Sequence, residues 1–226
     1  MSQGRELAVL YPASNSQASA DSRLADQAIA AFERRLAPAQ DLVDHAADIA
    51  AAAYAMATRF HLGGKLMTFG IGAASTDAQH VAVEFVHPVI VGKRALPASS
   101  LTSDVATLTA IAAGGGLGEI FAHQVRMLSR PADIALGISV DGNCPSVLAG
   151  LLAAREAGLL TVALTGAGGA GQAGGAELSA DHVLTARSAE PEVIKEIHVT
   201  IYHLLWELVH VFIEQPAVLQ AGAVKS

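Results

Sequence analysis

Short apolar segments that end in glycine-bearing turns alternate with longer segments of helical periodicity over most of this chain. Alternation of this kind is typical of βαβ crossovers, which place parallel strands in one sheet and cover both of its faces with helices. Aromatic residues make up only 4% of the sequence, which favours closely packed helices on a sheet over an all-β sandwich. The sequence therefore predicts a single α/β domain with a mostly parallel sheet. The expected strands are Lys65–Phe69, Ile134–Ser139, Leu160–Thr165 and His182–Ala186, and the expected helices are Thr76–Phe85, Asp104–Ala113, Glu119–Ser129, Pro145–Ala157 and Glu192–Glu214.

The N-terminal part of the chain is helical in pattern and precedes this alternation. Apolar residues recur at helical spacing in Ser22–Leu36 and in Ala39–His61. We expect Pro38 to separate two helices and Gly63-Gly64 to end the second of them. The expected organisation is a loose arm at 1–21, one domain at 22–216 and a C-terminal tail at 217–226.

Two helical segments indicate that the chain forms an oligomer. Glu192–Glu214 is apolar on more than one side, and Ala46–Ala57 consists largely of alanine. A helix that is apolar nearly all round has to be buried on several faces, which in a chain of 226 residues indicates a subunit interface. We therefore expect the N-terminal helices and the long C-terminal helix to form the oligomer interface.

Charge and cysteine content exclude several classes of partner. The formal net charge is −7, and no basic cluster is present to bind a nucleic-acid backbone. The single cysteine, Cys144, rules out an intrachain disulfide framework and fits a reducing compartment. The N-terminus lacks a basic segment followed by an apolar core, and no uncharged apolar run approaches the roughly 20 residues that a membrane span needs. We expect a cytoplasmic protein that binds neither nucleic acid nor membranes.

Two segments far apart in the sequence carry acid/base side chains on predicted helices. The first, Asp77–Glu84, directly follows an apolar strand and a glycine turn, and the second is Lys195–His203. His80 and Glu84 are four residues apart, so on a helix they share a face and can bind one metal ion or act as an acid/base pair. The neighbours of Glu84 are apolar, and burying a carboxylate among them is costly unless it is paired or functional. A strand, a tight turn and a helix N-terminus followed by these groups indicate a ligand site.

In their order and spacing, these residues resemble the sugar isomerase (SIS) domain family and, within it, the phosphoheptose (sedoheptulose 7-phosphate) isomerase branch. The most specific match is Asp77-Ala78-Gln79-His80 with Glu84. Near the C-terminus, Lys195-Glu196-Ile197-His198 with His203 matches the family's Gln-Glu-x-His and its later histidine. The other matching segments are Leu96-Pro97-Ala98, Leu101-Thr102-Ser103-Asp104, Leu108–Ala112, Gln124-Val125, Gly137-Ile138-Ser139 and Gly142-Asn143.

The resemblance implies a homotetramer with active sites between subunits that interconverts an aldose and a ketose through an enediol. Glu84 and His203 match positions that move protons, and His80, Glu84 and His203 match positions that bind zinc. The chemistry needs one group to remove a proton next to a carbonyl while another group, or a metal ion, protonates or polarises the oxygen. The implied cofactor is zinc, and the implied substrate is a small sugar or sugar phosphate. The residues expected to bind the substrate are Gly72, Ser75, Asp104, Ser139 and Asn143.

Departures from the family pattern cluster in the substrate loops. The family's first loop usually reads Gly-Asn-Gly-Gly-Ser-Ala, whereas Gly70–Ser75 reads Gly-Ile-Gly-Ala-Ala-Ser. The family's phosphate loop usually reads Ser-Thr-Ser-Gly-Asn-Ser, whereas Ser139–Cys144 reads Ser-Val-Asp-Gly-Asn-Cys. This loop has lost hydroxyl donors and gained Asp141, which repels a phosphate unless it is paired. Pro88 stands where the family often has Arg, and Lys195 replaces a Gln that binds metal in some members, so we expect a weakened zinc site.

Two other functions stay open from the sequence alone. One is a non-catalytic SIS-fold protein that binds a sugar phosphate or regulates a partner, and the other is an isomerase for a sugar without phosphate. Because the three acid/base residues are kept while the phosphate loop is altered, the pattern favours a changed substrate over lost chemistry. Single residues have structural alternatives as well. Asp104 can cap a helix, His198 and His210 can pack in an interface, and Lys93 and Arg94 are expected to be solvated unless they replace the lost phosphate contact.

Overall fold

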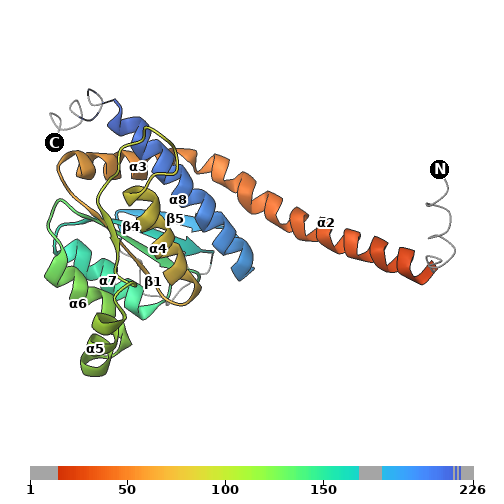
Figure 1. Cartoon of the computed structure of the whole chain (residues 1–226), viewed down its shortest axis with the longest axis horizontal. Coiled ribbons are helices and arrows are strands. Elements are labelled where there is room, and N and C mark those ends of the chain that lie inside the picture. The colour runs from red at the N-terminus through yellow and green to blue at the C-terminus, as the bar shows by residue number, and fades with distance from the viewer. Residues whose placement is uncertain (1–14, 168–179, 216, 218, 220–226) are drawn as a thin grey trace, which may run out of the picture.

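Five parallel strands form one sheet in the order β2-β1-β3-β4-β5 (Figure 1). The computed structural model describes residues 15–167, 180–215, 217 and 219. Four strands lie within one residue of their expected positions, which confirms the predicted α/β fold with its parallel sheet. The strands are β1 (Leu66–Gly70), β2 (Ala98–Ser100), β3 (Ile134–Ser139), β4 (Leu160–Gly166) and β5 (His182–Ala186).

The helices cover both faces of this sheet. None of the described helices is long and apolar enough to cross a membrane. A short 3-10 helix, η1 (Leu117–Glu119), precedes α6 and includes Glu119, the first residue of the helix expected at Glu119–Ser129. The helices are α2 (Asn15–Asp44), α3 (Ala46–His61), α4 (Ala73–Val86), α5 (Val105–Gly115), α6 (Ile120–Leu128), α7 (Pro145–Glu156) and α8 (Pro191–Ile213).

Two hydrophobic cores lie on opposite sides of the sheet. Strands β1, β3 and β4 are buried along their whole length, and alternate residues of a strand point to opposite faces. Leu66 therefore joins the core formed with α3, α4 and α8, whereas Met67 joins the core formed with α6 and α7. Helix α7 lies very close to the sheet at Gly150, where a Cβ atom would stand 2.8 Å from Cε2 of Phe69. Glycine is needed there to bring α7, and the loop before it, against the sheet.

Helix α2 is longer than expected and projects away from the body of the domain (Figure 1). It begins at Asn15, within the segment predicted to be a loose arm, and residues 1–14 of that arm lie outside the described residues. The predicted break at Pro38 is wrong, because α2 continues through this residue and the chain turns only at His45. A proline inside a helix removes one backbone hydrogen bond, but Pro38 is buried, so tertiary packing compensates. The expected tail at 217–226 lies almost wholly outside the described residues.

Ion pairs join α2 to the start of α8. Arg34 Nε lies 3.0 Å from Glu190 Oε2, and Arg35 Nε lies 2.6 Å from Glu196 Oε2. The hydrogen bond from Arg35 holds the pKa of the Glu196 carboxyl below its usual value. Such exposed pairs contribute little to stability, and they accompany the packing of α2 against α8.

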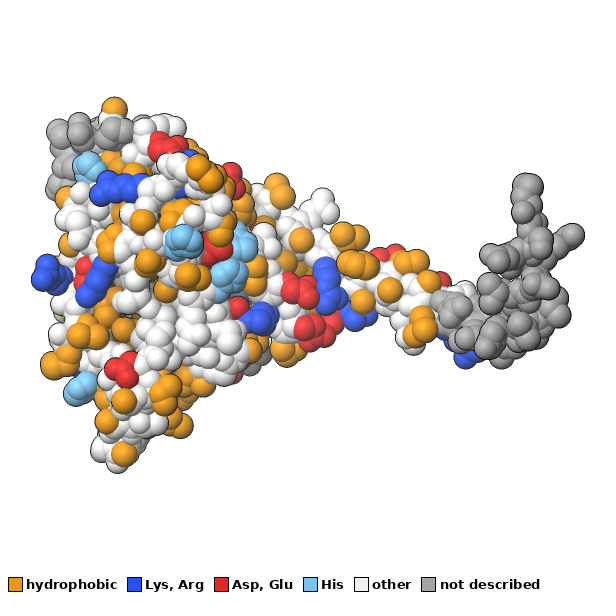
Figure 2. Space-filling view, in the orientation of Figure 1, with side chains coloured by type: hydrophobic (Ala, Val, Ile, Leu, Met, Phe, Trp, Pro, Cys, Tyr) orange, Lys and Arg blue, Asp and Glu red, His pale blue; other side chains and the backbone are white. Residues whose placement is uncertain are grey.

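Helix α8 buries much of its apolar surface within its own chain. It packs against α3 and α4 and lies over β4 and β5, and its buried residues recur every four positions, as Val193, Ile197, Ile201, Leu205 and Val209 do. The all-round apolar character of α8 is therefore explained in part without a second subunit. A row of exposed apolar side chains remains along α2, namely Leu24, Ile29, Phe32, Leu36 and Val43 (Figure 2).

The strand order places a switch point at the carboxyl ends of β1 and β3. The chain leaves β1 toward β2 on one side and returns to β3 on the other side. In open α/β sheets, ligands bind in the crevice at such a point. The loops there are Gly70–Ser75, after β1, and Ser139–Cys144, after β3, which are the two loops that depart from the family pattern.

Candidate active site

Helices α4 and α8 bring His80, Glu84 and His203 together. His80 Nε2 lies 3.1 Å from Glu84 Oε1, and His203 Nε2 lies 3.9 Å from the same oxygen. The Glu84 side chain is 13% exposed, whereas the two imidazoles are 43% and 46% exposed. Figure 2 shows histidine side chains gathered beside a carboxylate on this face of the molecule. The arrangement gives a largely buried carboxylate flanked by two accessible imidazoles.

The same three residues have the chemistry of a metal site. One ligand atom from each lies within 4.8 Å of the others. Two imidazole nitrogens and a carboxylate are ligands that zinc prefers, and a set of three leaves coordination positions for water or substrate. Within the described part of the chain, this is the one group of this kind. The donor set therefore fits a zinc ion.

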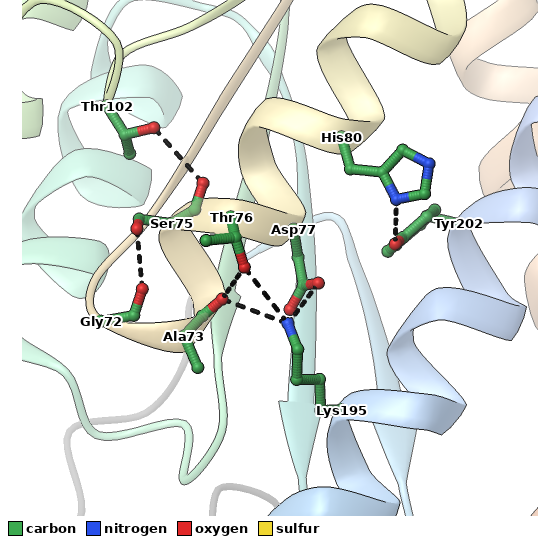
Figure 3. A network of polar contacts seen from close by, with 9 residues as sticks. All are labelled: Gly72, Ala73, Ser75, Thr76, Asp77, His80, Thr102, Lys195 and Tyr202. Carbon is green, nitrogen blue, oxygen red and sulfur yellow. Dashed lines mark hydrogen bonds and ion pairs between the residues drawn. The ribbon is translucent and has the colours of Figure 1, made fainter.

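The loop between β1 and α4 fixes the start of α4. Gly72 adopts φ +64°, a region that favours glycine, and a Cβ atom at Gly70 would stand 2.8 Å from the carbonyl oxygen of Ala74. The hydroxyl of Ser75 donates to the Gly72 carbonyl at 2.7 Å, and the hydroxyl of Thr102 donates to the Ser75 carbonyl at 3.4 Å (Figure 3). Gly72 and Ser75 thus have clear structural roles, and substrate contact by them stays a prediction.

Lys195 binds the first turns of α4. Its Nζ lies 2.5 Å from Oδ1 of buried Asp77 and also donates to the Ala73 carbonyl at 3.2 Å and to the Thr76 hydroxyl at 3.4 Å (Figure 3). The sequence placed this lysine beside the metal ligands. In the structure its ammonium group is instead directed to a carboxylate one turn before His80, which neutralises the positive charge.

Two residues of α8 that the sequence did not single out complete the surroundings of the cluster. The Tyr202 hydroxyl lies 2.9 Å from Nδ1 of His80 (Figure 3), and the indole N–H of Trp206 donates to the Glu84 carbonyl at 2.9 Å. Burial raises the pKa of the Tyr202 phenol, and the carboxylates of Asp77 and Glu84 raise it further, so the hydroxyl keeps its proton. A tyrosine inside an apolar helix is the available sequence signal, because a buried hydroxyl needs a partner.

In the loop after β3, hydrogen-bond donors of the loop bind the loop's own carboxylate, that of Asp141. Oδ1 of Asp141 accepts from the Ser139 hydroxyl and from the Asn143 backbone N–H, both at 3.0 Å. The Asn143 side-chain amide donates to the Asp141 carbonyl at 3.2 Å. Cys144 precedes α7 without a side-chain cap. Asp141 is therefore paired, but with neutral donors, so its negative charge stays at the helix N-terminus.

Asp104 caps helix α5. Its carboxylate accepts from the Thr107 backbone N–H at 3.1 Å and from the Thr107 hydroxyl at 2.6 Å. The bond from the hydroxyl, followed by that from the backbone, lowers the pKa of Asp104 below its usual value. The capping alternative is thus realised, and a contact with a sugar hydroxyl stays a prediction.

The two other histidines of α8 pack inside the chain. His210 Nδ1 lies 2.8 Å from the Trp206 carbonyl oxygen, and its Nε2 lies 3.0 Å from the Arg94 carbonyl oxygen. His198 is fully buried; a ring nitrogen lies near the Thr165 backbone, but within the described part of the chain neither nitrogen forms a hydrogen bond of normal geometry. Burial lowers the pKa of His198, so its ring is held neutral.

Lys93, expected to be solvated, is partly exposed and forms an ion pair. Its Nζ lies 2.6 Å from Glu214 Oε1, and its side chain is only 24% exposed. This ion pair connects the segment after α4 to the end of α8. Lys93 and Lys195 are thus already paired with carboxylates, whereas Arg94 is exposed.

Comparison with known proteins points to one group. The model of the SIS domain family matches residues 30–166. A phosphoheptose isomerase from Solidesulfovibrio magneticus is 41% identical over 190 residues, which cover 84% of this chain and 90% of the relative. The structure of a phosphoheptose isomerase from Neisseria gonorrhoeae matches with a TM-score of 0.72 at 28% identity, over 82% of this chain and 98% of that one. A phosphoheptose isomerase from Francisella tularensis matches with a TM-score of 0.74 at 31% identity, over 82% and 97% of the two chains.

Proposed function

This chain belongs to the SIS domain family and is a sugar phosphate isomerase, and from this premise we propose that it interconverts an aldose and a ketose through an enediol. The observation that carries the proposal is the convergence of His80, Glu84 and His203 from two helices. Proton transfer between adjacent carbons needs a base and an acid that face the same small volume, and this cluster supplies both.

Glu84 and His203 move the protons. The carboxylate of Glu84 removes the proton from the carbon next to the carbonyl, and the electron pair of that C–H bond forms the double bond of the enediol. His203 gives a proton to the carbonyl oxygen at the same time. The second half of the reaction reverses these steps on the neighbouring carbon, so both residues return to their starting states. The low exposure of Glu84, 13%, supports its role as the base, because water competes poorly for a buried carboxylate.

His80, Glu84 and His203 hold a zinc ion in this proposal. When bound, zinc would polarise the carbonyl oxygen in place of the proton from His203, because a coordinating imidazole nitrogen has no proton to give. Protein loaded with zinc is expected to carry about one ion per subunit. Elemental analysis that finds no metal after zinc loading, together with a His80→Ala variant that behaves like the parent protein, contradicts the metal role and leaves the proton transfers intact.

The substrate is a sugar phosphate held by the loops at the carboxyl ends of β1, β2 and β3. We propose contacts from Gly72, Ser75, Asp104, Ser139 and Asn143, as expected from the sequence. The Ser139 hydroxyl and the Asn143 N–H already bind Asp141, so a phosphate group has to compete with this carboxylate. This competition favours a substrate that differs from the usual one in its phosphate end or in the way that end is bound.

The assembly that we propose is a homotetramer with active sites between subunits, located in the cytoplasm. The exposed apolar row on α2 supports an oligomer, because monomers rarely expose so many large apolar side chains on one element. Light scattering that finds a homogeneous monomer at micromolar concentration contradicts this assembly.

Hydrogen exchange at carbon tests the proposed reaction directly. In D2O, the protein is expected to introduce deuterium at the carbon next to the carbonyl of sedoheptulose 7-phosphate or of a related ketose phosphate. Glu84→Gln is expected to slow this exchange by roughly 10²–10⁴-fold, the usual contribution of general base catalysis. Glu156→Gln is the matched control, because Glu156 is exposed at the far end of α7.

The alternative is a non-catalytic SIS-fold protein that binds a sugar phosphate or regulates a partner. The altered loop with Asp141 is the observation in its favour. Sugar phosphates that raise the melting temperature without any deuterium incorporation, in the parent protein and in Glu84→Gln alike, favour this alternative over the isomerase.

A further inference from the structure

The side chain of Tyr202 lies against both histidines of the active-site cluster. It is 1% exposed, and its ring meets the imidazoles edge-on, with centroids 5.5 Å from His80 and 4.9 Å from His203. Its hydroxyl lies 2.9 Å from His80 Nδ1 (Figure 3). A buried hydroxyl is nearly always hydrogen-bonded, so this contact determines how the phenol and the imidazole sit relative to each other.

The opposite nitrogen of His80 faces Glu84. Its Nε2 lies 3.1 Å from Glu84 Oε1, and an ionised carboxylate can only accept a hydrogen bond. In the metal-free protein a neutral imidazole therefore carries its proton on Nε2, and Nδ1 accepts a hydrogen bond from Tyr202. A cation on Nε2 requires the reverse arrangement, because a coordinating nitrogen has to be free of its proton and Nδ1 then donates.

A hydroxyl can serve both arrangements, since it donates in one and accepts in the other. We infer that Tyr202 is a positioning residue for the isomerase site: its hydroxyl directs Nε2 of His80 toward Glu84 and lets the His80 proton change nitrogen when the site fills. The inference rests on the proposed function only for its effect on turnover. The hydrogen-bond geometry on which it depends is independent of the reaction.

His210, two turns further along α8, is a useful contrast. Both of its ring nitrogens face backbone carbonyl oxygens, of Trp206 at 2.8 Å and of Arg94 at 3.0 Å. Carbonyl oxygens only accept, so a nitrogen that faces one has to carry a proton to form a hydrogen bond. The partner of His80 Nδ1 is instead a side chain whose hydrogen can rotate. His210 of α8 thus has fixed acceptors at both nitrogens, whereas His80 of α4 has a reversible partner at Nδ1.

Tyr202→Phe isolates the contribution of the hydroxyl, because it removes this group and keeps the buried aromatic packing. In the full-length protein labelled with ¹⁵N-histidine, at about pH 8 where histidine is neutral, long-range ¹H–¹⁵N spectra report which nitrogen carries the proton. In the unmodified protein, the His80 proton is expected on Nε2, and it is expected to move to Nδ1 when Zn²⁺ is added. Tyr202→Phe is expected to bind Zn²⁺ roughly 10–100-fold more weakly in competition with a chelator, the usual effect of losing such a partner.

The effect on turnover has its own expected pattern and control. Tyr202→Phe is expected to lower kcat while KM changes little, because the Tyr202 side chain is buried and its hydroxyl contacts His80. Tyr54→Phe is the matched control: Tyr54 packs edge-on against Phe212 at 5.4 Å between α3 and α8, so its loss of a hydroxyl should leave the Zn²⁺ affinity unchanged.

Two results overturn the inference. One is a Tyr202→Phe protein with unchanged Zn²⁺ affinity and an unchanged His80 spectrum. The other needs no variant: His80 protonated on Nδ1 in the unmodified, metal-free protein contradicts the assigned hydrogen bonds. If the unmodified protein takes up no Zn²⁺, the proposed cofactor fails, and the spectrum of the metal-free protein still decides the role of Tyr202.

Discussion

The loop Ser139–Cys144 makes a quantitative prediction about phosphate binding. The perturbation is the triple variant Val140→Thr, Asp141→Ser and Cys144→Ser, which restores three hydroxyls and removes one negative charge. Removal of the Asp141 carboxylate frees the two donors that it now engages at 3.0 Å, the Ser139 hydroxyl and the Asn143 N–H. A hydrogen bond to a charged group contributes roughly 1.5–3 kcal/mol before strain, which corresponds to about tenfold to 150-fold in affinity for each bond. The variant is expected to bind sedoheptulose 7-phosphate at least tenfold more tightly than the parent protein.

Calorimetry with matched ligands isolates the phosphate. Both proteins are titrated with sedoheptulose 7-phosphate and with unphosphorylated sedoheptulose, and the gain in affinity is expected only for the phosphorylated sugar. Asp141→Asn distinguishes the effect of the negative charge from the effect of the occupied hydrogen-bond donors. The new amide oxygen still accepts from the Asn143 N–H, but the negative charge is gone. This single variant is expected to gain less than the triple variant.

A clear result refutes this reasoning. If the parent protein turns over sedoheptulose 7-phosphate efficiently and the triple variant is no better, the phosphate does not bind at this loop. The cations that could bind the phosphate instead are Lys93, Arg94 and Lys195, and two of these would have to leave Glu214 and Asp77. In that case Asp141 has no part in substrate choice.

Three further predictions follow from single residues. Burial lowers the pKa of His198 from its ordinary value of 6.5. Below pH 6.5 the unfolded chain therefore gains a proton that the folded chain does not. The free energy of unfolding then falls by up to about 1.4 kcal/mol per pH unit until the pKa of the folded state is reached. Urea unfolding is expected to show a flatter pH dependence for His198→Leu, and an equal slope in both proteins contradicts the buried neutral ring. Asp104→Ala is expected to lower Tm by a few degrees through loss of the helix cap, with Asp104→Ser close to the parent protein; equal Tm values for all three would show that the cap contributes nothing. Lys195→Gln and Lys195→Met are both expected to unfold more easily, because buried Asp77 loses its cation. Lys195→Gln is expected to bind zinc more tightly than Lys195→Met, because Gln binds metal at this position in some members of the family; identical zinc affinities would show that residue 195 does not reach the metal.

The strands and most helices are predictable because they depend on local patterns. β3 and β4 are apolar runs bounded by turns, and their positions follow directly from the sequence. β2 is not predictable in this way, because Ala98–Ser100 has no apolar run and becomes a strand only by pairing with β1. The break placed at Pro38 is wrong for the opposite reason, since a correct local rule about proline is overridden by burial of the residue in the folded chain.

The candidate site divides along similar lines. The i, i+4 spacing of His80 and Glu84 is visible in one segment, whereas His203 is connected to them only through the family resemblance. The partners of Lys195 and Tyr202 are not predictable, because they lie on a different helix and depend on how α8 crosses α4. The sequence identifies which groups are present, and the packing of the two helices decides which of them are neutralised and which are positioned.

The close approach of α7 to the sheet at Gly150 has an evolutionary consequence. A single methyl group there would collide with Phe69, so the fold does not tolerate substitutions at this position. The loop just before α7 is different, because Ser139, Asp141 and Asn143 form their hydrogen bonds with one another within the loop. Mutations in the loop therefore cost the scaffold little, and substrate preference can diverge while α7 stays where it is.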